Sequence, residues 1–253
     1  RYGNQLSVSR LGFVPSAGAA GTDSTAYVPA LASVTGNRTV SCVNLANGTE
    51  GWGRATRGSI TVPPLVGGSS GRPVLYIATA RGAVFAFPAE PAVAAAPEPH
   101  WSAMVHGSVE HPPVMDGDLL LVSSERGDLW ALDQITGTPV WVHYSGERAL
   151  AKAWPAGDQV YFVNEAGYHA LSRENGQIVW SHDGLARFLC RRENTVYPMT
   201  SPGLISAMDT TSGEVLRTVE FPAETIFLGN TADHIFYMIT VDGLVVAVDK
   251  KID

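Results

Sequence analysis

Short apolar stretches that alternate with glycine turns run through the whole sequence. The clearest example is Gly127–Trp141, in which an apolar run leads to Asp133, then to Gly137 and finally to Trp141. An aspartate side chain can hydrogen-bond the backbone of a turn, and glycine tolerates the left-handed conformation that such turns often need. We therefore predict a strand, a tight turn and a second strand in this stretch.

The same spacing recurs along the chain. A small residue and an apolar residue precede Asp, Asn or Ser; a glycine follows after three more residues, and a tryptophan after a further three. The other copies contain Cys42, Gly48 and Trp52; Ala170, Gly176 and Trp180; Ala207, Asp209 and Gly213, with Arg217 in place of tryptophan; and Ala247, which opens a last copy.

The copies follow one another at intervals of about 40 residues, a period typical of four-stranded propeller blades and of some helical solenoids. Short β-rich runs divided by glycine and aspartate turns argue against helices. We predict an all-β fold, a single β-propeller domain of about six four-stranded blades. The blades are expected at approximately 5–56, 57–104, 105–146, 147–184, 185–221 and 222–253.

The innermost strand of each blade is expected near the start of its repeat. For the first blade we place it in Leu6–Val14, and for the others near Ser59–Val66, Val109–Met115, Leu150–Pro155, Ala186–Cys190 and Thr225–Leu228. Few residues follow Gly243, so the last blade is expected to lack its fourth strand. An uncovered strand edge invites pairing with another chain.

The alternation of strand, glycine, strand, Ala-Leu-Asp-x-x-Thr-Gly and a later tryptophan resembles the PQQ-like propeller repeat. That repeat builds quinoprotein alcohol dehydrogenases and also the non-catalytic lipoprotein propeller of the outer-membrane β-barrel assembly machinery. The resemblance extends from about Leu6 to Asp249. It implies structural roles for the motif residues, with Trp52, Trp141 and Trp180 docking one blade against the next.

Composition narrows the functional classes. The chain has 253 residues, of which 45% are hydrophobic and 16% charged, and its formal net charge is −7. This balance disfavours nucleic acid as a partner, because its phosphates usually require a basic surface. The apolar runs are too short for a transmembrane helix, so any membrane association is expected to run through partners.

Exposed turns are the candidate partner-binding surface. In a propeller, the turns between second and third strands and the loops between blades gather at one end. Several arginines fall there, and arginine offers planar, bidentate hydrogen bonds. The candidate residues are Arg81, Arg126, Glu165, Asp242, Arg148 and Arg187, together with Trp154 as an aromatic anchor or as rim packing.

Three further features of the sequence are weaker candidates for a functional site. His106 and His111 have acidic neighbours, but their spacing fits no recognised metal pattern. The Gly67–Gly71 stretch matches a nucleophile-elbow pattern, which requires a strand-to-helix turn rather than a hairpin. The second repeat carries a Pro/Ala-rich insertion, Pro88–Pro99, interpreted as a surface loop or a docking arm. We expect no catalytic residue, no cofactor and no metal.

These observations favour a non-catalytic propeller that serves as a scaffold or protein-interaction subunit. The expected setting is the bacterial periplasm or cell envelope, and the expected partners are other proteins of an envelope complex. Two alternatives stay open: a propeller that senses a ligand or a glycan, and a PQQ-dependent oxidoreductase. Against the second, no adjacent cysteines and no set of calcium ligands can be matched in the sequence.

Overall fold

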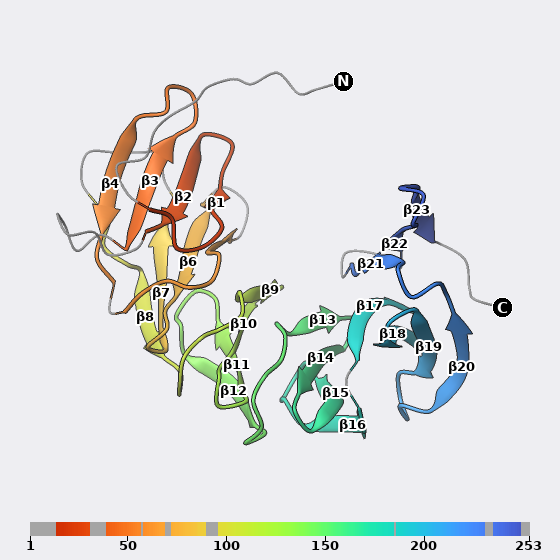
Figure 1. Ribbon diagram of the computed structural model, residues 1–253. Coiled ribbons are helices and arrows are strands. Elements are labelled where there is room, and N and C mark those ends of the chain that lie inside the picture. Colours follow the sequence, from red (N-terminus) through yellow and green to blue (C-terminus); the bar gives the residue numbers. More distant parts are fainter. Residues whose placement is uncertain are drawn as a thin grey trace. The chain divides into compact units, whose positions relative to one another are not determined.

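The structure is a computed structural model that describes residues 14–30, 39–56, 58–68, 72–89, 96–184, 186–230 and 235–248. The regular elements in these residues are 23 strands, and none of the described residues is helical. The chain divides into two compact units, Arg1–Val140 and Trp141–Asp253. Figure 1 labels the strands of both units.

The first unit holds the first two sheets and most of the third. In each sheet the strands are antiparallel and hydrogen-bond in sequence order. The first sheet comprises β1 (Ala20–Gly21), β2 (Thr25–Pro29), β3 (Val40–Asn44) and β4 (Glu50–Arg54); the second comprises β5 (Leu65–Gly67), β6 (Val74–Ala78), β7 (Ala83–Pro88) and β8 (Trp101–Met104); the third comprises β9 (Val114–Asp116), β10 (Leu119–Ser123), β11 (Asp128–Asp133) and β12 (Pro139–Tyr144), in which the boundary between the units falls.

The second unit continues the same pattern with two complete sheets and a shorter last one. The fourth sheet comprises β13 (Trp154–Ala156), β14 (Gln159–Asn164), β15 (Gly167–Ser172) and β16 (Ile178–His182); the fifth comprises β17 (Arg187–Arg192), β18 (Thr195–Ser201), β19 (Leu204–Asp209) and β20 (Val215–Glu220); the sixth comprises β21 (Ile226–Leu228), β22 (Phe236–Ile239) and β23 (Val245–Val248). Six sheets with three strands in the last confirm the predicted all-β propeller class. The single-domain boundaries stay a prediction.

The first strand of each sheet lies close to its expected place in five sheets, although these strands are short. In the first sheet that strand is β1, whereas the predicted Leu6–Val14 lies, apart from Val14, outside the described residues. The middle strands are the most apolar, and both β10 and β14 are buried throughout. In the first five sheets, burial therefore concentrates on the second and third strands, whereas β23 of the sixth sheet has no buried residue.

In the second and fourth sheets, an aromatic pair across the small residue of the repeat explains why that position is small. In the fourth sheet Ala170 pairs with Tyr161 on one side and Trp180 on the other. The Tyr161 and Trp180 rings meet over it with centroids 6.1 Å apart. Tyr76 and Trp101 do the same over Ala86, at 6.0 Å. A larger side chain in the middle would force the two rings apart.

The turn after the small residue is held by its own side chain. Asp133 Oδ1 accepts hydrogen bonds from the Thr136 amide at 2.7 Å, the Thr136 hydroxyl at 2.9 Å and the Ile135 amide at 3.0 Å. The Gly137 amide closes the turn on the Asp133 carbonyl at 2.8 Å, with a φ of 72° at the glycine. The bonds from Thr136 hold the pKa of Asp133 below its ordinary value. Asp209 and Gly213 repeat the arrangement.

Each of these turns receives a tryptophan from the preceding repeat. The Trp180 Nε1 donates to the Thr210 carbonyl at 2.7 Å, and the Trp180 ring covers Gly213 so closely that an added Cβ would lie 2.7 Å from it. Trp141 does the same to Arg173 and Gly176. Trp101 stands later in its repeat, yet its Nε1 donates to the Gln134 carbonyl at 3.0 Å and its ring covers Gly137 in the same way.

The second repeat has no glycine turn to receive Trp52, and a different contact takes its place. Trp52 is buried and lies against Phe87, with ring centroids 6.4 Å apart. Arg54 binds the end of the insertion. Its guanidinium pairs with both Glu98 carboxylate oxygens, at 2.8 and 3.1 Å, and donates to the Pro97 carbonyl at 2.7 Å.

Substituting the glycine beneath a tryptophan should therefore destabilise the fold beyond the backbone cost. In Gly176→Ala the new Cβ would lie 2.4 Å from Trp141 Cε3, at a φ of 71°. We expect about 1–2 kcal/mol from the left-handed backbone and about 1–3 kcal/mol more from overpacking. Denaturant unfolding measures the total.

Gly146→Ala is the matched control, because Gly146 has a similar φ of 74° and no neighbour within 4 Å of an added Cβ. It should lose only the backbone contribution. Equal losses in the two variants would contradict the packing explanation.

Candidate functional site

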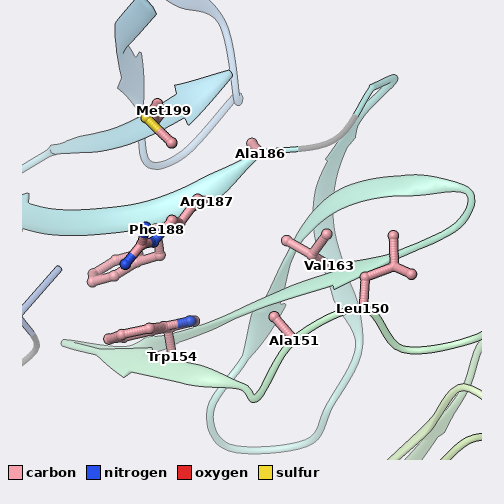
Figure 2. Close-up of a pocket in the computed structure, with 8 residues that line it drawn as sticks. All are labelled: Leu150, Ala151, Trp154, Val163, Ala186, Arg187, Phe188 and Met199. Carbon is pink, nitrogen blue, oxygen red and sulfur yellow. The ribbon is translucent and has the colours of Figure 1, made fainter. Parts of the chain in front are cut away.

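An apolar pocket in the second unit brings together two of the predicted surface residues. It has a volume of about 330 Å³, and its lining comes from the fourth and fifth sheets and the segment before β13. Figure 2 shows the side chains that line it: Leu150, Ala151, Trp154, Val163, Ala186, Arg187, Phe188 and Met199. Trp154 and Arg187 are the members expected from the sequence.

The pocket's aromatic wall is a stack that continues into the core. Trp154 lies almost parallel to Phe188, with centroids 5.5 Å apart and an angle of 22° between the rings (Figure 2). Phe188 is fully buried, and its ring centroid lies 5.2 Å from that of Tyr161, which in turn contacts Trp180. Trp154 itself is half-buried. The stack therefore holds one face of the pocket rigid while leaving part of the indole accessible.

The chain before β13 shapes the pocket by pairing with β14 in two short stretches. Ala149 forms a bridge with Asn164, and the Leu150 amide donates to the Val163 carbonyl at 3.0 Å. Pairing resumes at Trp154, which lies opposite Tyr161. The residues between the two stretches bulge away from β14, and Ala151 among them lines the pocket.

Two cationic groups lie at the pocket. Arg187 is exposed at the start of β17 and is the charged residue in the lining. Lys152 Nζ lies 4.3 Å from the ring centroid of Trp154, a distance suited to a cation–π contact. Partial burial lowers the pKa of Lys152 from its ordinary value. Lys152 carries no sequence motif, so only the fold reveals its position.

The other predicted rim residues are exposed but fall in different places. Glu165 lies in the β14–β15 turn, and its amide donates to the Arg148 carbonyl at 3.1 Å. In the chain, Glu165 is two residues from Val163 and Arg148 is two residues from Leu150, and both Val163 and Leu150 line the pocket. Arg81 and Arg126 lie in the β6–β7 and β10–β11 turns of the first unit, and Asp242 lies in the β22–β23 turn. The structure therefore places Trp154 and Arg187 in one pocket, with Arg148 and Glu165 close in the chain to residues that line it.

A buried histidine supports the turn that carries Glu165. Asn164 Oδ1 accepts the amides of Ala166 and Gly167, at 2.9 and 3.1 Å, and contacts His169 Nε2 at 2.9 Å. His169 Nδ1 lies 2.8 Å from the Ser181 hydroxyl. These contacts fit a neutral ring that donates from Nε2 and accepts at Nδ1. Burial, and secondarily the nearby His143, lower the pKa of His169.

A more polar pocket of about 710 Å³ is lined by other residues of the same two sheets, including Asp158, Arg173, Arg191 and Asn194. Its main charged pair is internally satisfied, since Arg191 Nη1 donates to Asp158 Oδ1 at 2.6 Å and to the Ala156 carbonyl at 2.8 Å. These bonds link β17 to the end of β13 and to the turn that follows it, so Arg191 has a structural role.

The histidines near the third sheet do not converge on a metal-like cluster. His106 lies edge-on to Trp130 with centroids 5.1 Å apart, and its Nδ1 is 3.8 Å from Asp128 Oδ2. Among the residues that the structure describes, no group of three or more His, Cys, Asp or Glu side chains could hold a metal ion. Most of the Gly67–Gly71 stretch lies outside the described residues.

The six antiparallel sheets and their tryptophan-capped turns define a β-propeller built from PQQ-like repeats. The family model described as outer membrane protein assembly factor BamB matches residues 36–251, and the chain belongs to that family. This confirms the resemblance found in the sequence. No curated protein sequence matches the chain.

Solved structures show the same fold at low sequence identity. BamB from Moraxella catarrhalis is 16% identical with a TM-score of 0.63, covering 94% of this chain and 78% of that one. The computationally designed Ika8 protein is 14% identical with a TM-score of 0.69, covering 97% and 74%. The quinohemoprotein alcohol dehydrogenase ADHIIG from Pseudomonas putida HK5 is 12% identical with a TM-score of 0.56, covering 84% of this chain but 43% of the enzyme.

The lowered pKa of His169 predicts a loss of stability on acidification. A group whose folded pKa lies below its ordinary value of 6.5 contributes full stability above that value and loses it as pH falls toward the folded pKa. The free energy of unfolding should therefore decrease between pH 7.5 and pH 5, and His169→Gln should flatten part of that decrease. Urea unfolding at several pH values measures it.

The control is His100→Gln, which changes an exposed histidine in the first unit. It should keep the pH dependence of the unmodified protein. The same slope in all three proteins would show that His169 does not titrate with unfolding.

Proposed function

We propose that this chain is a non-catalytic scaffold subunit of a bacterial cell-envelope complex, and that it binds other proteins of that complex through exposed turns. The observation that carries the proposal is family membership over residues 36–251, in a family described as an outer membrane protein assembly factor. An assembly factor acts by holding other proteins, so protein partners are the expected ligands.

The use of the repeated side chains supports the same proposal. Asp133 and Asp209 hold turns, and Trp141 and Trp180 cap the turns of following repeats. The residues that recur most regularly are thus used in folding. This leaves the variable, exposed turns as the part of the chain available for recognition.

The composition of the pocket surface also fits protein binding. Tryptophan and arginine are the residues most enriched at interface hot spots, particularly beside apolar surface that excludes water. Trp154 and Arg187 line one pocket here, and Arg148 is exposed close to it in the chain. The described part of the chain contains no helix with the length and hydropathy needed to cross a membrane.

Gentle affinity purification from native membranes tests the scaffold role. The expected result is a stoichiometric complex that survives moderate salt, with partners identified by mass spectrometry. Replacing Arg148 and Arg187 together by Glu should reduce the co-purifying partners at least tenfold, because opposite charge at a rim disfavours the original partner.

The matched control is Arg217→Glu, which reverses an exposed arginine on β20. It should retain the complex. A lone monomer of 26.9 kDa from the unmodified protein would refute the scaffold role.

The same preparation discriminates the two alternative functions. PQQ with calcium, or a panel of cell-wall glycans, should leave the unfolding temperature unchanged under the scaffold proposal. Ligands that bind the native state raise that temperature in proportion to the logarithm of their concentration over Kd. A saturable increase with PQQ and calcium would favour the oxidoreductase instead.

A further inference from the structure

The apolar pocket beside Trp154 has the size of a site for one large side chain. Its volume of about 330 Å³ is at the lower end of the roughly 300–1,000 Å³ found for small-molecule sites. One wall is the Trp154–Phe188 stack, and the remainder is formed by small or aliphatic residues and Met199 (Figure 2). An aromatic ring could pack edge-on against this stack, since edge-to-face aromatic pairs are favourable beyond the area they bury.

The charges at the pocket have one sign. Arg187 is the ionised residue among the eight that line it, and those eight, all within the described part of the chain, include no carboxylate. The Lys152 ammonium lies on the Trp154 ring. A purely apolar occupant would leave these cations without a counter-charge, whereas an occupant with an adjacent carboxylate would pair with Arg187.

The position of Arg187 suits a carboxylate held beside the pocket rather than inside it. Arg187 is exposed at the first residue of β17, and its neighbours Ala186 and Phe188 are both buried. The guanidinium therefore lies at the boundary between solvent and the apolar lining. An apolar group inside and an acid at the mouth match the chemistry of successive residues in a peptide.

We propose that this pocket binds a single aromatic side chain from an extended, acidic segment of a partner protein, with a neighbouring Asp or Glu paired to Arg187. The inference rests on the proposed scaffold function and identifies the kind of segment that the scaffold receives. Trp154 supplies the aromatic wall, Arg187 the counter-charge, and Val163, Ala186 and Met199 the apolar enclosure.

Peptide titration of the whole ¹⁵N-labelled protein tests this directly. The probes are acetyl-Asp-Phe-Asp-amide, acetyl-Asp-Ala-Asp-amide and acetyl-Lys-Phe-Lys-amide, and the readout is the Trp154 indole signal, assigned by its loss in Trp154→Phe. The Asp-Phe-Asp peptide should shift that signal in a saturable way. The Ala and Lys peptides should bind at least tenfold more weakly.

Charge reversal provides the second readout. Arg187→Glu should weaken the Asp-Phe-Asp peptide at least tenfold and improve the Lys-Phe-Lys peptide, because it inverts the sign at the mouth. Arg217→Glu changes net charge equally at an exposed position on β20 and should bind as the unmodified protein does. Both substitutions are at exposed side chains, and the unaltered indole signals of the other tryptophans verify folding.

Several outcomes would overturn the proposal. Equal binding of the acidic and basic peptides, no saturable shift of the Trp154 signal, or unchanged affinity in Arg187→Glu would each do so. Phenylacetate binding as tightly as the Asp-Phe-Asp peptide would identify a site for a small aromatic acid instead.

Failure of this inference is separable from failure of the scaffold function. A complex that co-purifies from membranes while no peptide binds leaves the scaffold role intact and removes only the pocket assignment. Peptide binding without any co-purifying partner removes the scaffold role and leaves a peptide-selective pocket.

Discussion

The structure depends most on the contact between a tryptophan and the glycine turn of the following repeat. Trp101, Trp141 and Trp180 are each fixed twice, by a hydrogen bond from Nε1 to a turn carbonyl and by close packing on a glycine with positive φ, as for Trp180 on Thr210 and Gly213. The contact needs both the side chain and the turn at the correct spacing. Because an aspartate holds the turn and a small residue admits the indole, one interaction explains most of the repeat.

Those requirements are why the fold could be predicted from the sequence. A repeat that must place a small residue, a turn and a tryptophan at fixed spacing leaves a pattern that survives when other positions vary. The prediction was least accurate for the short first strands, such as β13, which has three residues. Such strands carry little periodicity, and tertiary pairing decides where they begin. Trp101 stands later in its repeat than Trp141 does because of the insertion, and it still makes the same indole contact.

The candidate site was only partly accessible from the sequence. Arg187 and Trp154 stood out as an exposed cation and as an aromatic residue outside the repeat. Phe188 and Lys152 did not, because their roles come from the stacking of two sheets and from the bulge before β13. Chain positions that are distant in the sequence meet in that pocket, and no local pattern encodes the meeting.

The contacts of Arg54 with Pro97 and Glu98 indicate where the chain can accept an insertion. The sequence between β7 and β8 contains no glycine, and Arg54 binds the described part of this connection at Pro97 and Glu98. Extra sequence placed before Ala96 would leave every described indole contact unchanged. That position is therefore a natural attachment point for a reporter domain or an epitope, by which the protein could be followed in living cells with its blades intact.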